Sequence, residues 1–401
     1  MRFCMVTTFY PPYHFGGDAT YVRALARQLV AEGHSVDVIH CEDAYLVGGQ
    51  PPAPTETDDG VTVHRLKSRF GVISPLISQQ TGGPGLKKNE LKKLLAGDFD
   101  VVHFHNISLM GGPSVLKMSR SPVTLYTLHE HWLICPTHIL WKNKSKACDS
   151  RQCFTCCLKS RVPPQWWRYT SLVKESLKNV DCLLSPSQFT AKQHQHLAEK
   201  TPIVVLPLFS NLQPNSKKTL ATDDTRPRFL FVGRVTKSKG ITELLALFSV
   251  LPAYDLQVVG KGDLLASLKK KYALCSNITF TNELPQEQLV ALYQNATALI
   301  FPSRAPETFG LAIVEAFACG IPAIVRDAGA SRELIDQTGA GFVFQHDDEL
   351  KEIIIKLSQN PTLCEELGQK GLKSYQDFFT PKLHLKNYLT IIQDIQQIKG
   401  L

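Results

Sequence analysis

The sequence has no long hydrophobic run and no recognisable export signal. No apolar stretch among its 401 residues approaches the roughly 18 residues of a membrane span. The N-terminal segment Met1–Val6 leads directly into Pro11-Pro12 and lacks the apolar core and small-residue cleavage site of a signal peptide. We therefore expect a cytoplasmic protein, and in that reducing compartment its 11 cysteines should not form structural disulfides.

The chain also has fewer acidic residues than basic ones. The chain has 44 lysines and arginines against 36 aspartates and glutamates, a formal net charge of +8, which favours an anionic partner. A nucleotide, an acidic lipid surface and a nucleic acid are all compatible with this balance. The hydrophobic share of 43% and the charged share of 20% are those of an ordinary globular protein, and the length suits two domains of roughly 200 residues each.

The start of the chain lacks the G-x-G-x-x-G fingerprint of dinucleotide-binding proteins, but it has a related arrangement. A strand at Arg2–Val6 is followed by a loop containing Gly16 and Gly17 and by a helix with apolar residues at helical spacing. A Gly-Gly pair alone is only a turn signal, so this loop by itself is weak evidence for nucleotide binding.

Four histidines lie on or near two predicted strands. The strand Val123–Leu128 places His129 just beyond its carboxyl end, where parallel sheets bind ligands. His131 competes with His129 for this role. His103 and His105 lie on one face of another strand, and histidines in such a position are more often hydrogen-bonded core residues than functional groups.

Residues 135–169 differ in composition from the rest of the chain. Five cysteines in this insert, including a C-x-x-C pair, indicate a structural metal site, with tetrahedral zinc favoured over an iron–sulfur cluster. The alternative is that they are small buried apolar residues. The candidate ligands are Cys135, Cys148, Cys153 and Cys156, and Cys157 can replace Cys156.

The same insert is basic and aromatic, with Asp149 as its single carboxylate. This composition suits a peripheral contact with an anionic membrane or an acidic, lipid-linked acceptor, and the tryptophans could stack on a sugar acceptor. Single-stranded nucleic acid could use such a platform, but nothing else in the sequence supports it, and we expect no nucleic acid partner. A solvated basic loop over buried tryptophans is an equal alternative. The residues concerned are Trp141, Lys142, Lys144, Lys146, Arg151, Lys159, Arg161, Trp166, Trp167, Arg168 and Tyr169.

In the C-terminal half, two buried strands run into glycine-containing loops. One strand continues into Gly233, Arg234 and Lys239, and the next ends at Gly260. Cations fixed at the end of a strand can stabilise the negative charge that develops on a leaving diphosphate, without a metal ion.

A further strand, loop and helix, residues 298–325, hold two carboxylates. Glu307 lies on the loop and Glu315 about two turns into the helix, which Thr308 can cap. The free amides and partial positive charge of the helix N-terminus suit an anionic ligand. Glu315 is the one charged group on a helix that should be buried, and a buried carboxylate needs a partner, which the hydroxyls of a ribose or hexose would supply.

Glu307 and Glu315 are separated by seven residues, and in the setting Phe301–Ser303 and Glu307–Leu311 they resemble the EX7E signature of retaining glycosyltransferases of family 4. The resemblance covers nearly the whole chain except the cysteine insert. It implies an α/β protein of the GT-B fold, with two facing Rossmann-like domains, parallel sheets and an interdomain cleft. It also implies transfer of a hexose from a nucleotide-diphosphate sugar to the hydroxyl of a glycan, a lipid-linked sugar or a small molecule, with no cofactor required.

The resemblance assigns roles to the candidate residues. Glu307 would hold the sugar hydroxyls, Glu315 the ribose hydroxyls, and His129 would lie near the anomeric carbon. Arg234 and Lys239 would bind the diphosphate. The other implied donor-binding residues are Gly16, Gly17, Gly233, Gly260, Leu284, Phe309, Gly310 and Leu311. Any metal in the cysteine insert would be structural.

We expect an acceptor-side domain over residues 1–210, a donor domain over 211–380, and a final helix over 381–401 that packs back on the first domain. The polar run Asn211–Arg226 is the predicted linker. Two rival functions remain: a nucleotide-sugar epimerase of the same fold, and a non-catalytic protein that docks on a membrane or partner through the cysteine insert. The acidic and basic residues of the candidate site argue against the second rival.

Overall fold

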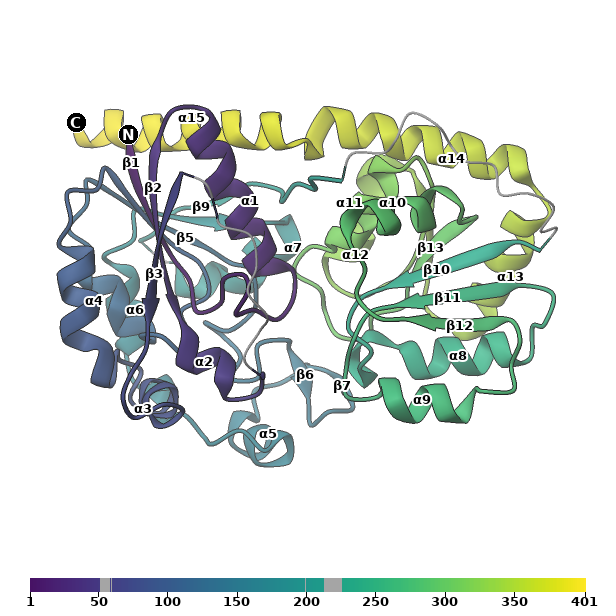
Figure 1. The fold of residues 1–401 in the computed structure, drawn as a ribbon, viewed down its shortest axis with the longest axis horizontal. Coiled ribbons are helices and arrows are strands. Elements are labelled where there is room, and N and C mark those ends of the chain that lie inside the picture. The colour runs from purple at the N-terminus through teal and green to yellow at the C-terminus, as the bar shows by residue number, and fades with distance from the viewer. Residues whose placement is uncertain (51–57, 59, 199, 213–225) are drawn as a thin grey trace. The chain divides into compact units, whose positions relative to one another are not determined.

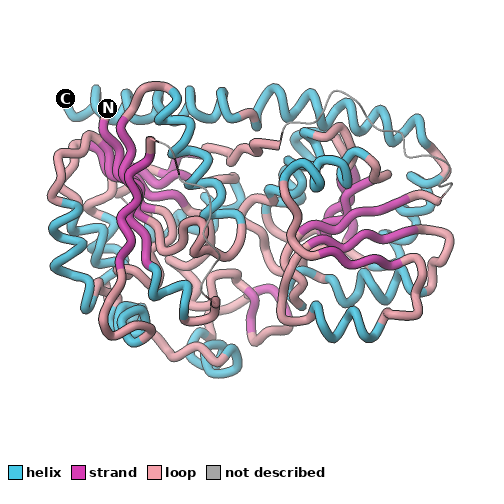
Figure 2. The backbone as a smooth tube through the Cα atoms, viewed as in Figure 1, coloured by secondary structure: helices cyan, strands magenta, loops and turns pink. Residues whose placement is uncertain are grey.

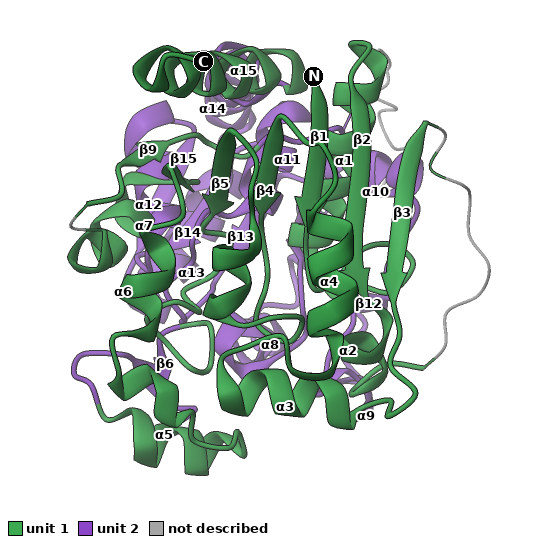
Figure 3. Ribbon diagram, turned by 90° about the vertical axis from the view of Figure 1, so that its left-hand side faces the viewer, with its two compact units in different colours: residues 1–139, 152–208, 381–401 green, residues 140–151, 209–380 purple. Residues whose placement is uncertain are grey.

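The computed structural model describes all residues except 51–57, 59, 199 and 213–225. Its contacts divide the chain into two compact units (Figure 3). The first unit comprises residues 1–139, 152–208 and 381–401, and the second comprises 140–151 and 209–380. The two main boundaries therefore lie at 208/209 and 380/381, and the assignment of 140–151 to the second unit has no counterpart in the sequence prediction. Most of the predicted linker lies outside the described residues.

The first unit is built on a seven-stranded parallel sheet of order β3-β2-β1-β4-β5-β8-β9. Successive strands run in one direction because helices and loops return the chain over the faces of the sheet. The order reverses between β1 and β4, and ligands bind at such switch points in open parallel sheets. The strands are β1 (Arg2–Val6), β2 (Ser35–Cys41), β3 (Val61–Leu66), β4 (Val101–Phe104), β5 (Val123–Thr127), β8 (Cys182–Ser185) and β9 (Ile203–Val205).

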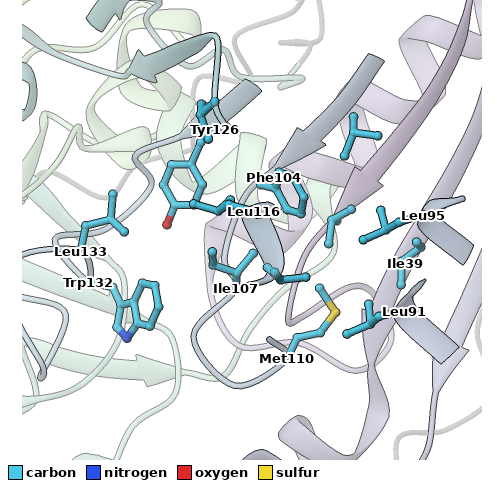
Figure 4. Packing of buried hydrophobic residues seen from close by; sticks show 14 of the residues in the cluster. Ile39, Leu91, Leu95, Phe104, Ile107, Met110, Leu116, Tyr126, Trp132 and Leu133 are labelled. Carbon is cyan, nitrogen blue, oxygen red and sulfur yellow. The ribbon is translucent and has the colours of Figure 1, made fainter. Parts of the chain in front are cut away.

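The first unit's core forms where helices cover this sheet. Figure 4 shows part of it, in which Phe104, Ile107 and Leu116 pack near Tyr126 and Trp132. The indole of Trp132 is only 1% exposed, so the loop after β5 is anchored in the core. The helices are α1 (Gly17–Ala31), α2 (Glu42–Leu46), α3 (Ile73–Thr81), α4 (Lys88–Leu95), α5 (Cys153–Ser160), α6 (Leu172–Leu177), α7 (Gln188–His194) and α15 (Pro381–Lys399).

Helix α15 belongs to the first unit although it ends the chain. The Tyr21 hydroxyl lies 2.8 Å from Nε2 of His384, and the Tyr388 hydroxyl lies 3.0 Å from Nδ1 of His103. Both rings of α15 are buried in these contacts. The final helix therefore packs on the first unit.

The second unit contains a six-stranded parallel sheet of order β12-β11-β10-β13-β14-β15, with its switch point between β10 and β13. Figure 2 shows its strands alternating with helices. The strands are β10 (Arg228–Val232), β11 (Asp255–Val259), β12 (Ile278–Thr281), β13 (Ala298–Phe301), β14 (Ala323–Arg326) and β15 (Gly341–Phe344). The helices are α8 (Ile241–Ser249), α9 (Leu265–Lys271), α10 (Gln286–Gln294), α11 (Leu311–Ala318), α12 (Ala330–Thr338), α13 (Asp347–Ser358) and α14 (Pro361–Ser374).

A short antiparallel hairpin, β6 (Trp141–Lys142) with β7 (Lys146–Ala147), completes the second unit. Trp141 is 6% exposed, and the guanidinium of Arg304 lies 5.9 Å from its ring centre. The Lys142 ammonium is buried, where it donates hydrogen bonds to Asp149 (2.9 Å) and Ser150 (2.7 Å). These contacts order the hairpin, which the sequence had placed in a solvated or acceptor-side loop.

The predicted cap of α11 is wrong. Helix α11 begins at Leu311, and its N-cap is Gly310 with φ 114°, without a side-chain hydrogen bond from the cap. The loop after Thr308 therefore continues for two more residues, because Gly310 can adopt a conformation that side-chain-bearing residues avoid. Within the described residues, no helix is both long enough and apolar enough to cross a membrane.

Candidate functional site

An ion pair occupies the carboxyl edge of the second unit's sheet. The ammonium of Lys239, on the loop after β10, lies 2.6 Å from Oε1 of Glu307, on the loop after β13. The side chains are 19% and 16% exposed, so water screens the two charges only in part. The hydroxyl of Ser303 donates to the same Glu307 oxygen. Lys239 also lies 5.5 Å from the ring centre of Phe301. The structure thus joins two candidate residues that stand far apart in the sequence.

The backbone of Glu307 is held from the other side by the start of α12. Its carbonyl accepts a hydrogen bond from the amide of Ala330 at 2.9 Å, and its own amide donates to Ala328 at 3.4 Å. Gly329 between them has φ 75°, and a Cβ there would lie 2.5 Å from the Glu307 nitrogen. Sequence reasoning missed Gly329, because only the folded chain brings it against Glu307.

Backbone also packs against backbone where the loops after β10, β11 and β13 meet. A Cβ at Gly240 would lie 2.1 Å from the carbonyl oxygen of Pro302, and one at Gly260 would lie 2.0 Å from that of Gly233. These glycines bring the loops closer than any side chain allows. The exposed Arg234 lies on the first of these loops, five residues before Lys239.

Glu315 has a partner that the sequence did not indicate. The hydroxyl of Tyr293, on α10, donates to its Oε2 at 2.7 Å. Desolvation raises the pKa of Glu315 to about 7, although this hydrogen bond favours the charged form. Tyr293 is fully buried. The sequence analysis expected a ligand hydroxyl as the partner of this carboxylate. The structure supplies a protein hydroxyl for one of its two oxygens.

Replacing Glu315 with glutamine should stabilise the protein more at pH 8 than at pH 5. The folded pKa lies above the ordinary value of 4.5, so the wild type loses stability as pH rises from the unfolded pKa through the folded one. Glutamine has no such ionisation. The full shift corresponds to about 3 kcal/mol, and partial exposure should reduce the difference to about 1–2 kcal/mol. Thermal unfolding at both pH values measures it, with the exposed Glu365→Gln as control. An equal effect on stability at both pH values would contradict the raised pKa of Glu315.

At the carboxyl edge of the first unit's sheet, three histidines lie side by side, with ring centroids 3.9 Å apart for His103 and His105 and 5.2 Å apart for His105 and His129. Nδ1 of His105 lies 3.0 Å from Nε2 of His129, and Nε2 of His103 lies 2.8 Å from the Thr127 hydroxyl. His103 and His105 are buried core residues, as expected. Crowding by surrounding atoms lowers the pKa of His129 to about 3, although part of its surface is accessible. Its imidazole is therefore neutral near pH 7.

The competitor His131 is only 1% exposed, and its ring stacks on His194 with centroids 5.5 Å apart. His131 is thus a core residue, and His129 is the one that a ligand at this edge could reach.

One carboxylate that sequence reasoning missed, Asp18, lies beside the glycine loop. Gly16 and Gly17 are exposed, and Asp18 follows them in the first turn of α1. Burial, followed by the charge of Glu130, raises the pKa of Asp18 to about 6. The amide of Asn106 lies 3.4 Å from its Oδ2. The sequence signal that could have identified Asp18 is its position directly after the Gly-Gly pair.

The remaining donor-binding candidates lie at the same edge of the second unit's sheet. Phe309 is buried, whereas Gly310 and Leu311 at the start of α11 are partly exposed. Leu284 follows β12, in the turn before α10.

The cysteine prediction remains untested. All eleven cysteines are in the thiol form, and Cys135, Cys156 and Cys157 are buried whereas Cys148 is exposed. Cys148 belongs to the second unit and the other candidate ligands to the first. In the part of the chain that the structure describes, no group of three or more His, Cys, Asp or Glu side chains is arranged to hold a metal ion. The zinc site therefore has no support from these side-chain positions.

Known families match both halves of the chain. Residues 15–213 match the model described as Glycosyltransferase Family 4, and residues 213–374 match Glycosyl transferases group 1. An uncharacterized glycosyltransferase of Methanocaldococcus jannaschii is 27% identical over 84% of this chain and 83% of its own length. The GDP-mannose-dependent alpha-mannosyltransferase of Mycolicibacterium smegmatis is 26% identical, over 86% of this chain and 85% of its own length.

Solved structures show the same fold. Sucrose-phosphate synthase from Thermosynechococcus elongatus superposes with a TM-score of 0.74 at 21% identity, covering 100% of this chain and 99% of that one. HepE of Anabaena, in complex with UDP and glucose, gives a TM-score of 0.67 at 16% identity, covering 98% of this chain and 99% of that one.

Proposed function

We propose that this chain, which belongs to glycosyltransferase family 4 and has the GT-B fold, transfers a hexose from a nucleotide-diphosphate sugar to an acceptor hydroxyl with retention of anomeric configuration. The contact between Lys239 and Glu307 is the observation that carries this proposal. The contact brings an ammonium and a carboxylate together at the edge where an open parallel sheet holds ligands, which supports assigning Lys239 to the diphosphate and Glu307 to the sugar. Solved neighbours of the same fold were obtained with UDP, glucose or UDP-glucose.

The proposed donor site divides its work between charge and hydrogen bonding. Lys239 and Arg234 bind the diphosphate together with amides at the start of α11, and this preorganised positive charge stabilises the leaving group. Glu307 accepts hydrogen bonds from the sugar and Glu315 from the ribose. The loop at Gly260 and the turn at Leu284 border the base, and Gly233 lets the chain turn sharply before Arg234 and Lys239.

We propose a front-face displacement assisted by the leaving phosphate. The bond between the anomeric carbon and the diphosphate oxygen breaks, and the acceptor oxygen bonds to that carbon from the same face. The acceptor proton passes to a phosphate oxygen, so the products are a glycoside and a nucleoside diphosphate. His129 is neutral near pH 7, and it would serve as a hydrogen-bonding group beside the anomeric carbon. No metal or other cofactor is part of this proposal.

The proposed setting is the cytoplasm, which suits eleven cysteines in the thiol form. Acceptors consistent with the proposal are hydroxyls of a glycan, of a lipid-linked sugar or of a small molecule.

The donor can be identified by thermal shift against a panel of nucleotides and nucleotide sugars. A stabilising shift is expected for one nucleoside diphosphate family, since a ligand at 100 times its Kd adds about 2.7 kcal/mol. The shift should vanish in Lys239→Ala and Glu315→Ala but persist in Lys237→Ala, an exposed lysine of the same loop. Absence of a shift with every nucleotide would overturn the proposed donor site. Epimer or free sugar formed without acceptor would identify an epimerase instead.

A further inference from the structure

Exposed apolar side chains gather in two short segments of the first unit. The described residues include seventeen large hydrophobic side chains that are exposed, and nine of these lie within 70–86 and 154–169. The most exposed are Ile73 (54%), Leu158 (57%), Trp166 (64%) and Tyr169 (63%). Single exposed hydrophobic residues are ordinary, but a cluster of this size marks an interaction surface.

The two segments form one continuous structure. The indole Nε1 of Trp167 donates to the carbonyl of Gln79 on α3 at 2.8 Å, and a Cβ at Gly82 would lie 2.9 Å from the Trp167 ring. Figures 1 and 3 both show α3 and α5 at the same end of the first unit, opposite α15. The exposed ring of Trp166 lies 5.8 Å from Phe154 and 6.2 Å from Tyr169. We call residues 70–76 and 154–169 the docking face.

The sequence around the docking face has no acidic residue. Residues 60–89 and 150–174 contain ten lysines and arginines and no aspartate or glutamate. The whole chain has 36 acidic residues in 401, so average composition would place about five in these segments. Lys67 is paired with Glu42 and the buried Lys87 with Asp43, but Arg69, Lys159 and Arg161 are exposed beside the apolar side chains. The surface is therefore both apolar and positively charged.

We propose that the docking face binds the surface of an anionic lipid bilayer. Tryptophan and tyrosine favour the headgroup region, aliphatic side chains enter the upper acyl region, and lysines and arginines attract acidic lipids. A protein partner would need a patch that combines negative charge with apolar side chains. An acidic bilayer offers negative headgroups and apolar chains over its whole surface. This binding does not depend on catalysis.

The docking face is also linked to the candidate site of its own unit. The Trp167 ring lies 5.7 Å from that of Trp132, three residues after His129, and the Arg168 guanidinium lies 5.1 Å from the Trp132 ring centre. Buried residues beneath the docking face therefore pack on the loop that carries His129, which connects this face to the acceptor side of the proposed site. This consequence, unlike membrane binding itself, rests on the proposed function.

Vesicle co-sedimentation of the full chain, without donor or acceptor, tests the proposal. The wild type should bind vesicles containing phosphatidylglycerol, bind pure phosphatidylcholine at least tenfold less, and dissociate as salt rises. Both Ile73→Ser/Trp166→Ser and Lys159→Glu/Arg161→Glu should reduce binding at least tenfold. Thermal unfolding should be unchanged, because all four side chains are exposed.

Matched controls come from the second unit. Val250→Ser/Leu274→Ser removes apolar side chains that are 70% and 100% exposed, and Lys270→Glu/Lys271→Glu reverses an exposed lysine pair. Neither change should alter vesicle binding. Wild type that stays in the supernatant, or controls that lose as much binding as the docking-face variants, would overturn the proposal. Self-association without vesicles that Ile73→Ser/Trp166→Ser abolishes would identify a second copy as the partner instead, and would also overturn it.

Discussion

Lys239→Met should lower kcat/KM for transfer on the order of 10³-fold, the effect of losing one preorganised charge at a leaving group. The ammonium lies 2.6 Å from Glu307, so the substitution removes the cation and leaves a carboxylate that is mostly out of water. Steady-state kinetics with the donor found by thermal shift measure the loss. Lys237→Met on the same loop should retain activity, because its side chain is exposed.

The effect of Lys239→Met on stability can be separated from its effect on catalytic activity. Removing one partner of a mostly buried pair destabilises a protein because the other charge is left uncompensated. The double variant Lys239→Met/Glu307→Gln should therefore recover thermal stability but not activity. If the double variant also recovered turnover, or if Lys239→Met kept near-normal kcat/KM, the proposed roles of this pair would be wrong.

Gly240→Ala should destabilise the second unit by about 3 kcal/mol or more and abolish nucleotide binding. Gly240 has φ 70°, and an added Cβ would lie 2.1 Å from the carbonyl oxygen of Pro302. The loop carrying Lys239 would have to move away from the loop carrying Glu307. Thermal unfolding and nucleotide titration measure the two effects.

Gly339→Ala is the matched control for this substitution. Gly339 has φ 60° and nothing within 4 Å of an added Cβ. Alanine at this position therefore has only the cost of a left-handed backbone conformation, about 1 kcal/mol, without a steric clash. Equal losses at the two positions would show that backbone conformation, rather than close packing of the two loops, determines the effect.

Patterns local in sequence predicted most of the fold. The alternation of short apolar strands with amphipathic helices indicated two parallel sheets, and β1 coincides with its predicted residues Arg2–Val6. Glu307 and Lys239 could be proposed separately, because each follows a strand. Their contact could not be predicted from spacing alone, since it depends on which strands are neighbours: β10 pairs with β13.

The features that sequence reasoning missed depend on contacts between distant segments. Thr308 has the chemistry of a cap, but the helix starts at Leu311, after a loop in which Glu307 pairs with Gly329. Nothing in the sequence singles out Tyr293, and only folding brings its hydroxyl to Glu315. Only one part of the docking face could be proposed from the sequence. Helix α5 lies in the cysteine insert, which has an unusual composition, whereas α3 carries no motif.

The hairpin at 141–147 has a consequence for recombining this protein with its relatives. The second unit is not one continuous stretch, since it includes residues 140–151, where Trp141 packs against Arg304. A chimera joined only at residue 209 would complete its second unit with a hairpin from the other parent. Arg304 also contacts Glu243 on α8, so a mismatched hairpin would perturb the loop that leads to Glu307. Exchange of the second unit between relatives should therefore carry residues 140–151 along with 209–380.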